Sequence, residues 1–276
     1  MALLPATRLF AQAPEPGKPS SPQYEIVELP GQKVAMEDGI RLSVDVYRPA
    51  AAGRFPVIVC ITPYGSTSGQ GRFYAARGYA YLMANSRGRY DSEGDWSPYH
   101  PQHKRDGYAL IQWAAAQPWS NANVGMEGAS YNGSTQWWTA SEAPPALKAI
   151  IPFVAPPDAF ENTPYQNGVL QGWCFDWAAA HSGRVAKEAG VGAYHGWTPG
   201  RADALRNTPY IDLNRARGAD APWFRNWYTN NLSTDAFWRQ IAYQGPKGWA
   251  KIKVPSLNVT GWFDANHPGG PMNFVG

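Results

Sequence analysis

The sequence has little of what marks several protein classes. It contains two cysteines, Cys60 and Cys174, which are too few for a disulfide framework or a four-ligand zinc site, so two buried thiols are expected. It has no run of about 18 apolar residues, which excludes a membrane-spanning helix. Charged residues make up only 16% of the chain, and its Lys and Arg are scattered. We therefore expect neither nucleic acid nor a membrane as a partner.

What the sequence does contain is a large apolar and aromatic fraction. Of its 276 residues, 44% are hydrophobic, and 28 Gly with 25 Pro supply many turns. At about 150 residues per domain, this length corresponds to one large or two small domains. The composition is typical of a loop-rich globular enzyme and not of a fibrous, coiled or disordered chain.

Residues 1–23 resemble a processed leader or a disordered spacer. Residues 11–13 (AQA) have the small-x-small pattern of a cleavage site, and a Pro- and Ser-rich stretch follows up to residue 22. A basic start is lacking, and Pro5 and Arg8 interrupt the short apolar stretch. We expect an exported precursor with a secreted or periplasmic location, and a cytoplasmic protein with a disordered tail is the alternative.

The ordered part of the chain opens with a predicted antiparallel hairpin. Apolar and polar residues alternate over 32–36 and 40–46, on either side of the turn Asp38-Gly39. Residues 56–61 (PVIVCI) then form a continuous apolar run that ends at a Thr-Pro-Tyr-Gly turn. Such a run predicts a strand that is buried on both faces of a parallel sheet.

After this strand, expected helices and strands alternate, which predicts an α/β fold with a mostly parallel sheet. They are helices 73–77, 102–116 and 133–141 and strands 79–84, 124–127 and 147–151. The alternation stops after residue 156 and returns at an expected strand 253–260. The predicted organisation is a core at 24–156, a helical cap at 157–251 and a resumed core at 252–276.

The sharpest motif is segment 124–133 (VGMEGASYNG), where a strand runs into a glycine, a serine and a helix. This is the pattern of a nucleophile elbow, whose serine occupies a strained strand-to-helix turn between small residues. The turn lifts Ser130 Oγ above the sheet and directs a helix N-terminus at developing negative charge. Asn132 stands where a second glycine is usual, but Asn tolerates positive φ. An ordinary glycine-rich turn is the alternative on this motif alone.

Six sequence blocks in order resemble the CocE/NonD hydrolases of the X-Pro dipeptidyl-peptidase type, which include cocaine esterase and α-amino acid ester hydrolases. The blocks are MEDGIRL (36–42) with DVYRP (45–49), TPY (62–64), SRGRY (86–90) with SEG (92–94), QPWS (117–120), GASYNG (128–133) and TGWFD (260–264). The resemblance extends over almost all of residues 30–276. It implies an α/β-hydrolase fold with helices on both faces of the sheet and an inserted helical cap. In this family the elbow is commonly Gly-x-Ser-Tyr-x-Gly, which Asn132 fits.

The resemblance also implies roles for individual residues. Ser130 is the expected nucleophile, which forms an acyl-enzyme that water later hydrolyses. The backbone N–H of Tyr131 and the hydroxyl of Tyr64 are the expected oxyanion donors. Asp264, just beyond the predicted strand 253–260, is the expected triad acid. Asp158, after the preceding strand, is the alternative acid.

The catalytic histidine is missing from this set. The five histidines are His100, His103, His181, His195 and His267, and of these His267 alone follows Asp264. A base three residues after its orienting acid would struggle to reach Ser130 and still bond that acid, so we expect a loop or pocket role for His267. The resembled family carries its histidine further on, before a jelly-roll domain. We therefore expect a fragment of a longer protein, with turnover near background.

Two other clusters have ordinary structural interpretations. Most of the tryptophans between residues 137 and 238 are expected to pack the helices and the cap, although an aromatic acyl pocket is the alternative. The charged loop 87–95, with Arg87, Arg89 and Glu93, is expected to be held by ion pairs and turns.

The sequence thus predicts a serine hydrolase that cleaves ester or amide bonds of a small acyl substrate through Ser130, with no metal and no organic cofactor. An X-Pro exopeptidase is one alternative. A noncatalytic binding protein with an α/β-hydrolase-like fold is another, which the missing histidine supports. Substrate choice depends on contacts in the cap that the sequence does not place.

Overall fold

The computed structural model describes residues 18–65, 68–156, 160, 162–185, 206, 209–212 and 221–276. The cleavage-site pattern at residues 11–13 lies outside these residues, as do Asp158 and His195. The domain boundaries at residues 156 and 251 stay a prediction.

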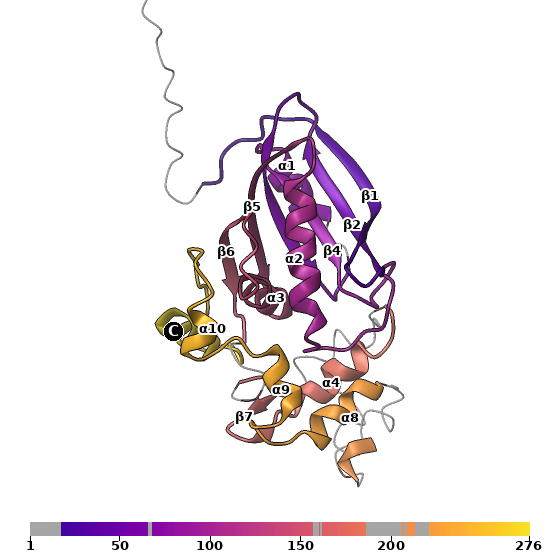
Figure 1. The fold of residues 1–276 in the computed structure, drawn as a ribbon, viewed down its shortest axis with the longest axis vertical. Helices are drawn as coiled ribbons and strands as arrows, with labels where there is room; N and C mark the ends of the chain where they lie inside the picture. Colours follow the sequence, from indigo (N-terminus) through magenta and orange to yellow (C-terminus); the bar gives the residue numbers. More distant parts are fainter. Residues whose placement is uncertain are drawn as a thin grey trace, which may run out of the picture.

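A six-stranded sheet forms the centre of the molecule, in the order β1-β2-β4-β3-β5-β6 (Figure 1). Its strands are β1 (Ile26–Ala35), β2 (Arg41–Pro49), β3 (Phe55–Thr62), β4 (Ala80–Asn85), β5 (Ser120–Ala129) and β6 (Leu147–Phe153). The pairings of β1 with β2 and of β2 with β4 are antiparallel, whereas β3 pairs in parallel with β4 and β5, and β5 with β6. The predicted mostly parallel sheet is confirmed.

The predicted hairpin and the doubly buried strand are also confirmed. In β2, Leu42, Val44 and Val46 are almost completely buried on one face, as the alternation required. Gly39 takes a φ of +83° in the connecting turn, a backbone conformation that favours glycine. Strand β3 lies between β4 and β5, and its alternate side chains enter two separate apolar clusters on opposite faces of the sheet.

Helices cover both faces of this sheet. Helices α2 (Gln102–Ala115) and α3 (Tyr131–Ala140) pack together in the larger cluster, and α1 (Ser68–Ala75) contributes Ala75 to the smaller one. The expected helix 73–77 was misplaced, since α1 begins at Ser68 and ends at Ala75. Its first half contains Gly69 and Gly71, which are poor helix formers. Gly71 is required there because a Cβ atom would meet the ring of Tyr47 at 2.3 Å.

The close packing of α2 against α3 depends on Gly107. A Cβ atom at this position would meet Thr139 Oγ1 at 1.9 Å. We expect Gly107→Ala to lower the free energy of unfolding by about 1–3 kcal/mol, since an overpacked interface must shift. Gly69→Ala is the matched control, because no atom lies within 4 Å of the added methyl group. Urea unfolding of both variants tests this, and equal stabilities would contradict it.

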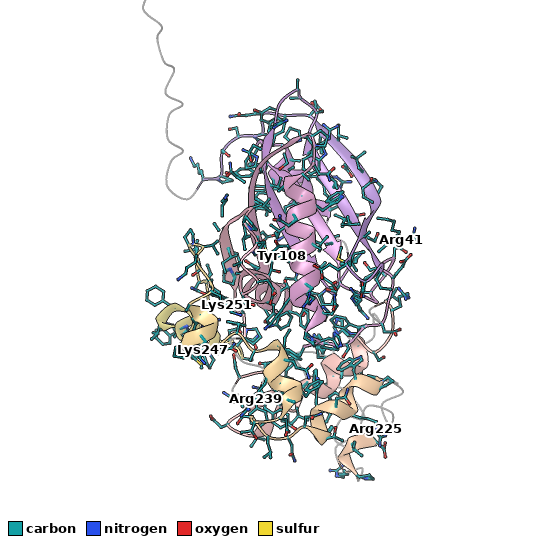
Figure 2. The ribbon with its side chains drawn as sticks, viewed as in Figure 1. Arg41, Tyr108, Arg225, Arg239, Lys247 and Lys251 are labelled. Carbon is teal, nitrogen blue, oxygen red and sulfur yellow. The ribbon has the colours of Figure 1, made fainter. Side chains whose placement is uncertain are left out.

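Beyond β6, short elements follow. They are β7 (Tyr165–Gln166), β8 (Val169–Leu170), α4 (Trp173–Ala180), the 3-10 turn η1 (Tyr210–Asp212), α8 (Pro222–Thr229), α9 (Ala236–Ile241), α10 (Pro246–Trp249) and α11 (Gly269–Val275). Of these, β7, α4, α8 and α9 lie together at one end of the sheet, and α10 lies beside β6 with the C-terminus (Figure 1). None of the described helices is long and apolar enough to cross a membrane. Figure 2 shows Arg41, Arg225 and Lys247 in separate parts of the molecule.

The expected strand 253–260 is only partly formed. Two isolated parallel bridges, Ile150 with Ser256 and Phe153 with Val259, hold this segment beside β6. Pro255 and Pro152 face this pairing and have no N–H to donate, which interrupts the ladder. The segment nevertheless runs parallel to β6 at the edge of the sheet, and the loop that carries Asp264 follows it.

Candidate active site

The candidate site lies where the carboxyl ends of three parallel strands meet. Tyr64 follows β3, Ser130 follows β5 and Pro156 follows β6. All three residues line one pocket. In open α/β sheets this edge is where ligands bind, because the loops that leave neighbouring parallel strands converge there.

Ser130 occupies the strained turn that the elbow motif predicts. Its backbone has φ +58° and ψ −122°, a conformation that non-glycine residues rarely adopt and that costs about 1–3 kcal/mol. Its N–H donates to Phe153 O at 2.9 Å, which anchors the turn to β6. Helix α3 begins at the next residue, so the partial positive charge of its N-terminus faces the Ser130 side chain.

The small residues around the elbow are required by close approaches. Gly128 has φ +143°, and a Cβ atom there would meet Asn132 Cβ at 2.6 Å. A Cβ atom at Gly133 would meet Ala155 Cβ at 2.7 Å and Phe153 O at 3.0 Å. Gly133, one position after Asn132, therefore lets α3 pack against the chain that follows β6.

The Tyr64 hydroxyl lies at the elbow. Burial raises the pKa of this phenol, and contacts with the side chains of Trp177 and Ser130 and with the Tyr131 backbone lower it. The hydroxyl thus approaches both the Ser130 side chain and the main chain at Tyr131. The structure brings together three of the residues singled out from the sequence, although their roles stay predictions.

The described lining of the pocket around these residues is aromatic and carries no charged side chain. The cavity is small, with a volume of about 20 Å³, which is close to the space of one water molecule. Its described lining consists of Tyr64, Tyr99, Ser130, Tyr131, Pro156, Thr163, Trp173, Cys174, Trp177, Trp227 and Asn266. None of these side chains is formally charged at neutral pH. Tryptophans therefore both pack the cap and form part of the pocket wall, and binding of an acyl group by this pocket stays a prediction.

Asn266 and Thr163 are pocket residues that the sequence analysis missed. Thr163 Oγ1 donates to Asn266 Oδ1 at 2.8 Å, and Asn266 is buried. The two residues lie 103 positions apart, so no local pattern could have paired them. Their bond ties the loop after segment 255–259 to the start of the cap.

Asp264 lies close to this loop bond. Its Oδ1 accepts a hydrogen bond from Asn266 N at 2.7 Å, which forms a local turn. This turn places the carboxylate two residues from Asn266, a wall residue of the pocket. Among the described residues, no hydrogen bond joins Asp264 to Ser130 or to a histidine ring, so its role as triad acid stays a prediction.

His267 and His181 border the site in different ways. The His267 ring packs on Trp262 at 4.9 Å between centroids, and the backbone N–H of His267 donates to the backbone carbonyl oxygen of Asp264 at 3.0 Å. The His181 ring packs edge-on to Tyr64 at 5.2 Å, and its Nδ1 bonds Trp177 O at 2.8 Å. Burial lowers the pKa of His181 to about 4, so this ring is neutral near pH 7.

A buried carboxyl group lies on β5 just before the elbow. Tyr81 donates its hydroxyl to Glu127 Oε1 at 2.5 Å, and Cys60 lies beside both residues. Burial raises the pKa of Glu127 above its ordinary value of 4.5, and the Tyr81 bond offsets part of this rise. Burial, with the charge of Glu127, raises the pKa of Cys60 to about 12, which fits the predicted inert thiol.

The raised pKa of Glu127 makes stability depend on pH in a defined direction. The folded state holds the Glu127 proton more tightly than the unfolded state does. The resulting contribution to the free energy of unfolding is fully present below about pH 4.5 and is lost as pH rises through the folded-state pKa. We expect Glu127→Gln to gain stability relative to the wild type between about pH 4 and pH 7. The exposed Glu25→Gln is the control. Unfolding curves at both pH values test this, and a parallel response of wild type and Glu127→Gln would contradict it.

Within the described residues, no group of three or more His, Cys, Asp or Glu side chains is gathered as the ligands of a metal ion would be. The described lining of the pocket offers hydroxyl, phenol, thiol and amide side chains.

Comparison with known proteins gives a consistent family likeness. Residues 38–275 match the X-Pro dipeptidyl-peptidase (S15) family. The chain is 29% identical over 253 residues to cocaine esterase from Rhodococcus sp., an alignment that covers 84% of this chain and 43% of that protein.

Solved structures agree with this likeness. An α-amino acid ester hydrolase superposes with a TM-score of 0.73 at 24% identity, covering 99% of this chain and 48% of its own. A CocE/NonD family hydrolase from Staphylococcus aureus superposes with a TM-score of 0.62 at 26% identity, covering 83% of this chain and 40% of its own. The predicted α/β-hydrolase fold and the CocE/NonD resemblance are confirmed. The chain spans less than half the length of each of these relatives.

Proposed function

Because the chain belongs to the X-Pro dipeptidyl-peptidase (S15) family, whose relatives include serine esterases, we propose that it forms an acyl-enzyme at Ser130 with small esters. The observation that carries the proposal is the convergence of the strained Ser130, the Tyr64 hydroxyl and the Tyr131 main chain at one pocket. A nucleophile and two oxyanion donors are what acyl transfer requires.

In the proposed reaction, Ser130 Oγ bonds to the carbonyl carbon of the ester and loses its proton to a general base. The carbonyl oxygen becomes an oxyanion, which accepts hydrogen bonds from Tyr64 Oη and from the Tyr131 N–H. The C–O bond to the leaving alcohol then breaks, the alcohol takes up a proton, and the acyl group stays on Ser130. Water later releases the acid. Asp264 would orient a histidine base, which we do not assign to a residue of this chain.

The described lining of the pocket favours an uncharged acyl group over the free N-terminus of a peptide. An exopeptidase that removes dipeptides must bind a cationic amino group, which calls for carboxylates or other acceptors in the pocket. The described lining instead consists of aromatic rings, hydroxyls, one thiol, one amide and one proline. We therefore propose esters with aromatic or branched apolar acyl groups as the substrate class.

Single-turnover acylation tests this proposal and requires no complete catalytic cycle. The protein is incubated with p-nitrophenyl benzoate and, separately, with Ala-Pro-p-nitroanilide, and the mass of the intact chain is followed. We expect one benzoyl group, mapped to Ser130, and no dipeptidyl adduct. Faster acylation by Ala-Pro would favour the X-Pro exopeptidase. No adduct from either reagent would favour the noncatalytic binding protein.

A further inference from the structure

Arg89 is a buried cation without an ion pair among the described residues. Its side chain is 0% exposed. Its Nε donates to Pro63 O at 2.8 Å, and its Nη1 donates to the carbonyl oxygens of His181 and Gly183. Its Nη2 is buried and has no hydrogen-bond partner in the described structure. Buried charges are normally paired with an opposite charge, so this arrangement requires an explanation.

Arg87, in the same loop, has the ion pairs that Arg89 lacks among the described residues. Arg87, two positions earlier in the same loop, pairs with Asp38 at 2.8 Å and with Asp106 at 2.6 Å. The predicted tying of this loop by ion pairs is therefore confirmed for Arg87, and for Glu93 through Arg41. It is wrong for Arg89, which reaches backbone carbonyls of two distant loops instead.

The contacts of Arg89 surround the turn that carries Tyr64. The carbonyl that its Nε holds belongs to Pro63, the residue before Tyr64. The neighbouring Tyr90 donates its hydroxyl to Tyr64 O at 2.6 Å, and the Arg89 guanidinium lies 5.5 Å from the centre of the Tyr90 ring. A Cβ atom at Gly65 would meet that ring at 2.5 Å. Arg89 and Tyr90 thus fix the main chain on both sides of the phenol.

We propose that Arg89 is a positioning residue for the oxyanion hole, which holds the Tyr64 turn in place and sets an uncompensated positive charge behind the Tyr64 phenol. This inference rests on the proposed function of Ser130. A fixed positive charge stabilises negative charge that develops in a desolvated pocket, and it does so without reorganisation during the reaction.

The surroundings of Tyr64 support the electrostatic part of this proposal. The charge of Arg89 acts to lower the pKa of Tyr64, against the larger opposing effect of burial. A more acidic phenol is a stronger hydrogen-bond donor to an oxyanion. The other titratable groups around the phenol are Tyr99, Tyr131 and His181, all neutral near pH 7, and Tyr90, whose hydroxyl bonds Tyr64 O; the cation Arg184 lies near Arg89.

The test measures the affinity of phenylboronic acid, a probe that mimics the tetrahedral intermediate. Ser130 Oγ bonds to boron, its proton passes to solvent, and the boronate becomes an anion in the oxyanion hole. We expect Arg89→Gln to weaken this affinity about tenfold, within the range for residues that share one hydrogen-bond network. Arg89→Lys, which keeps the charge, is expected to recover most of it. Arg184→Met is the control, because Arg184 bonds the Tyr90, Ser92 and Gly94 carbonyls but not Pro63.

A double-mutant cycle separates a positioning role from a merely structural one. If Arg89 acts through Tyr64, Arg89→Gln has no further effect on affinity in a Tyr64→Phe background. In parallel, 3-fluorotyrosine at position 64 is titrated by ¹⁹F NMR, and its midpoint is expected to rise in Arg89→Gln but not in Arg184→Met. Additive losses, or an unmoved midpoint, would overturn the inference. If Arg89→Gln does not fold, Arg89→Met gives the same readouts.

Failure of the proposed function is recognised separately. A Ser130→Ala variant that binds phenylboronic acid as well as the wild type would show that the probe does not use the elbow, which overturns the function. The Tyr64 titration still decides the electrostatic role of Arg89 in that case, because it needs neither probe nor catalysis.

Discussion

Ser130→Ala is expected to abolish covalent capture of a fluorophosphonate probe. The probe reacts with an activated serine in a desolvated site, and the elbow supplies the only serine that combines positive φ, a pocket and a helix N-terminus among the described residues. Loss of the nucleophile in a triad hydrolase lowers kcat on the order of 10⁶-fold. Intact-protein mass spectrometry measures the labelled fraction over time.

Ser134→Ala is the matched control for this experiment. Ser134 lies one turn further along α3, is buried, and donates to Pro156 O at 3.4 Å. This variant should be labelled at the wild-type rate. Labelling of Ser130→Ala at a comparable rate would show that another residue reacts, and the assignment of the nucleophile would be wrong.

Tyr64→Phe is expected to weaken phenylboronic acid binding by about 10²–10³-fold, the usual effect of removing one oxyanion donor. The ring of Phe fills the same space, so the change removes a hydroxyl and leaves the packing on His181 in place. Isothermal titration calorimetry or tryptophan fluorescence gives the dissociation constants.

Tyr99→Phe provides the control for the loss of a phenol in the same pocket. Tyr99 lines this pocket and is buried, but its hydroxyl has no assigned role at Ser130. We expect Tyr99→Phe to change the dissociation constant of phenylboronic acid by less than about threefold, the size of effect usual for a substitution that does not interact directly with the probe. Equal losses of affinity in the two variants would mean that binding depends on the general polarity of the pocket and not on the Tyr64 hydroxyl as an oxyanion donor.

The features that could be predicted from the sequence are those that depend on local patterns. The hairpin around Gly39, the buried run of β3 and the elbow at Ser130 each follow from a few consecutive residues, and the structure confirms each of them. In the elbow, steric limits at Gly128 and Gly133 act within a single turn. Such constraints appear directly in the residue types.

The features that were missed depend on contacts between distant segments. The bond between Thr163 and Asn266 and the contacts of Arg89 with Pro63, His181 and Gly183 join loops that the sequence does not pair. The ion-pair prediction for Arg89 was wrong because backbone carbonyls took the place of carboxylates. The start of α1 was missed because tertiary packing of Gly71 on Tyr47 outweighs its low helix propensity.

The most direct test of the account is a crystal structure of the protein after reaction with a phosphonate ester. We predict a covalent bond between phosphorus and Ser130 Oγ. The phosphonyl oxygen should lie about 2.7–3.1 Å from both Tyr64 Oη and Tyr131 N, the distance range of oxyanion donors. Phosphorus bound to another residue, or a phosphonyl oxygen directed away from Tyr64, would contradict the proposed site.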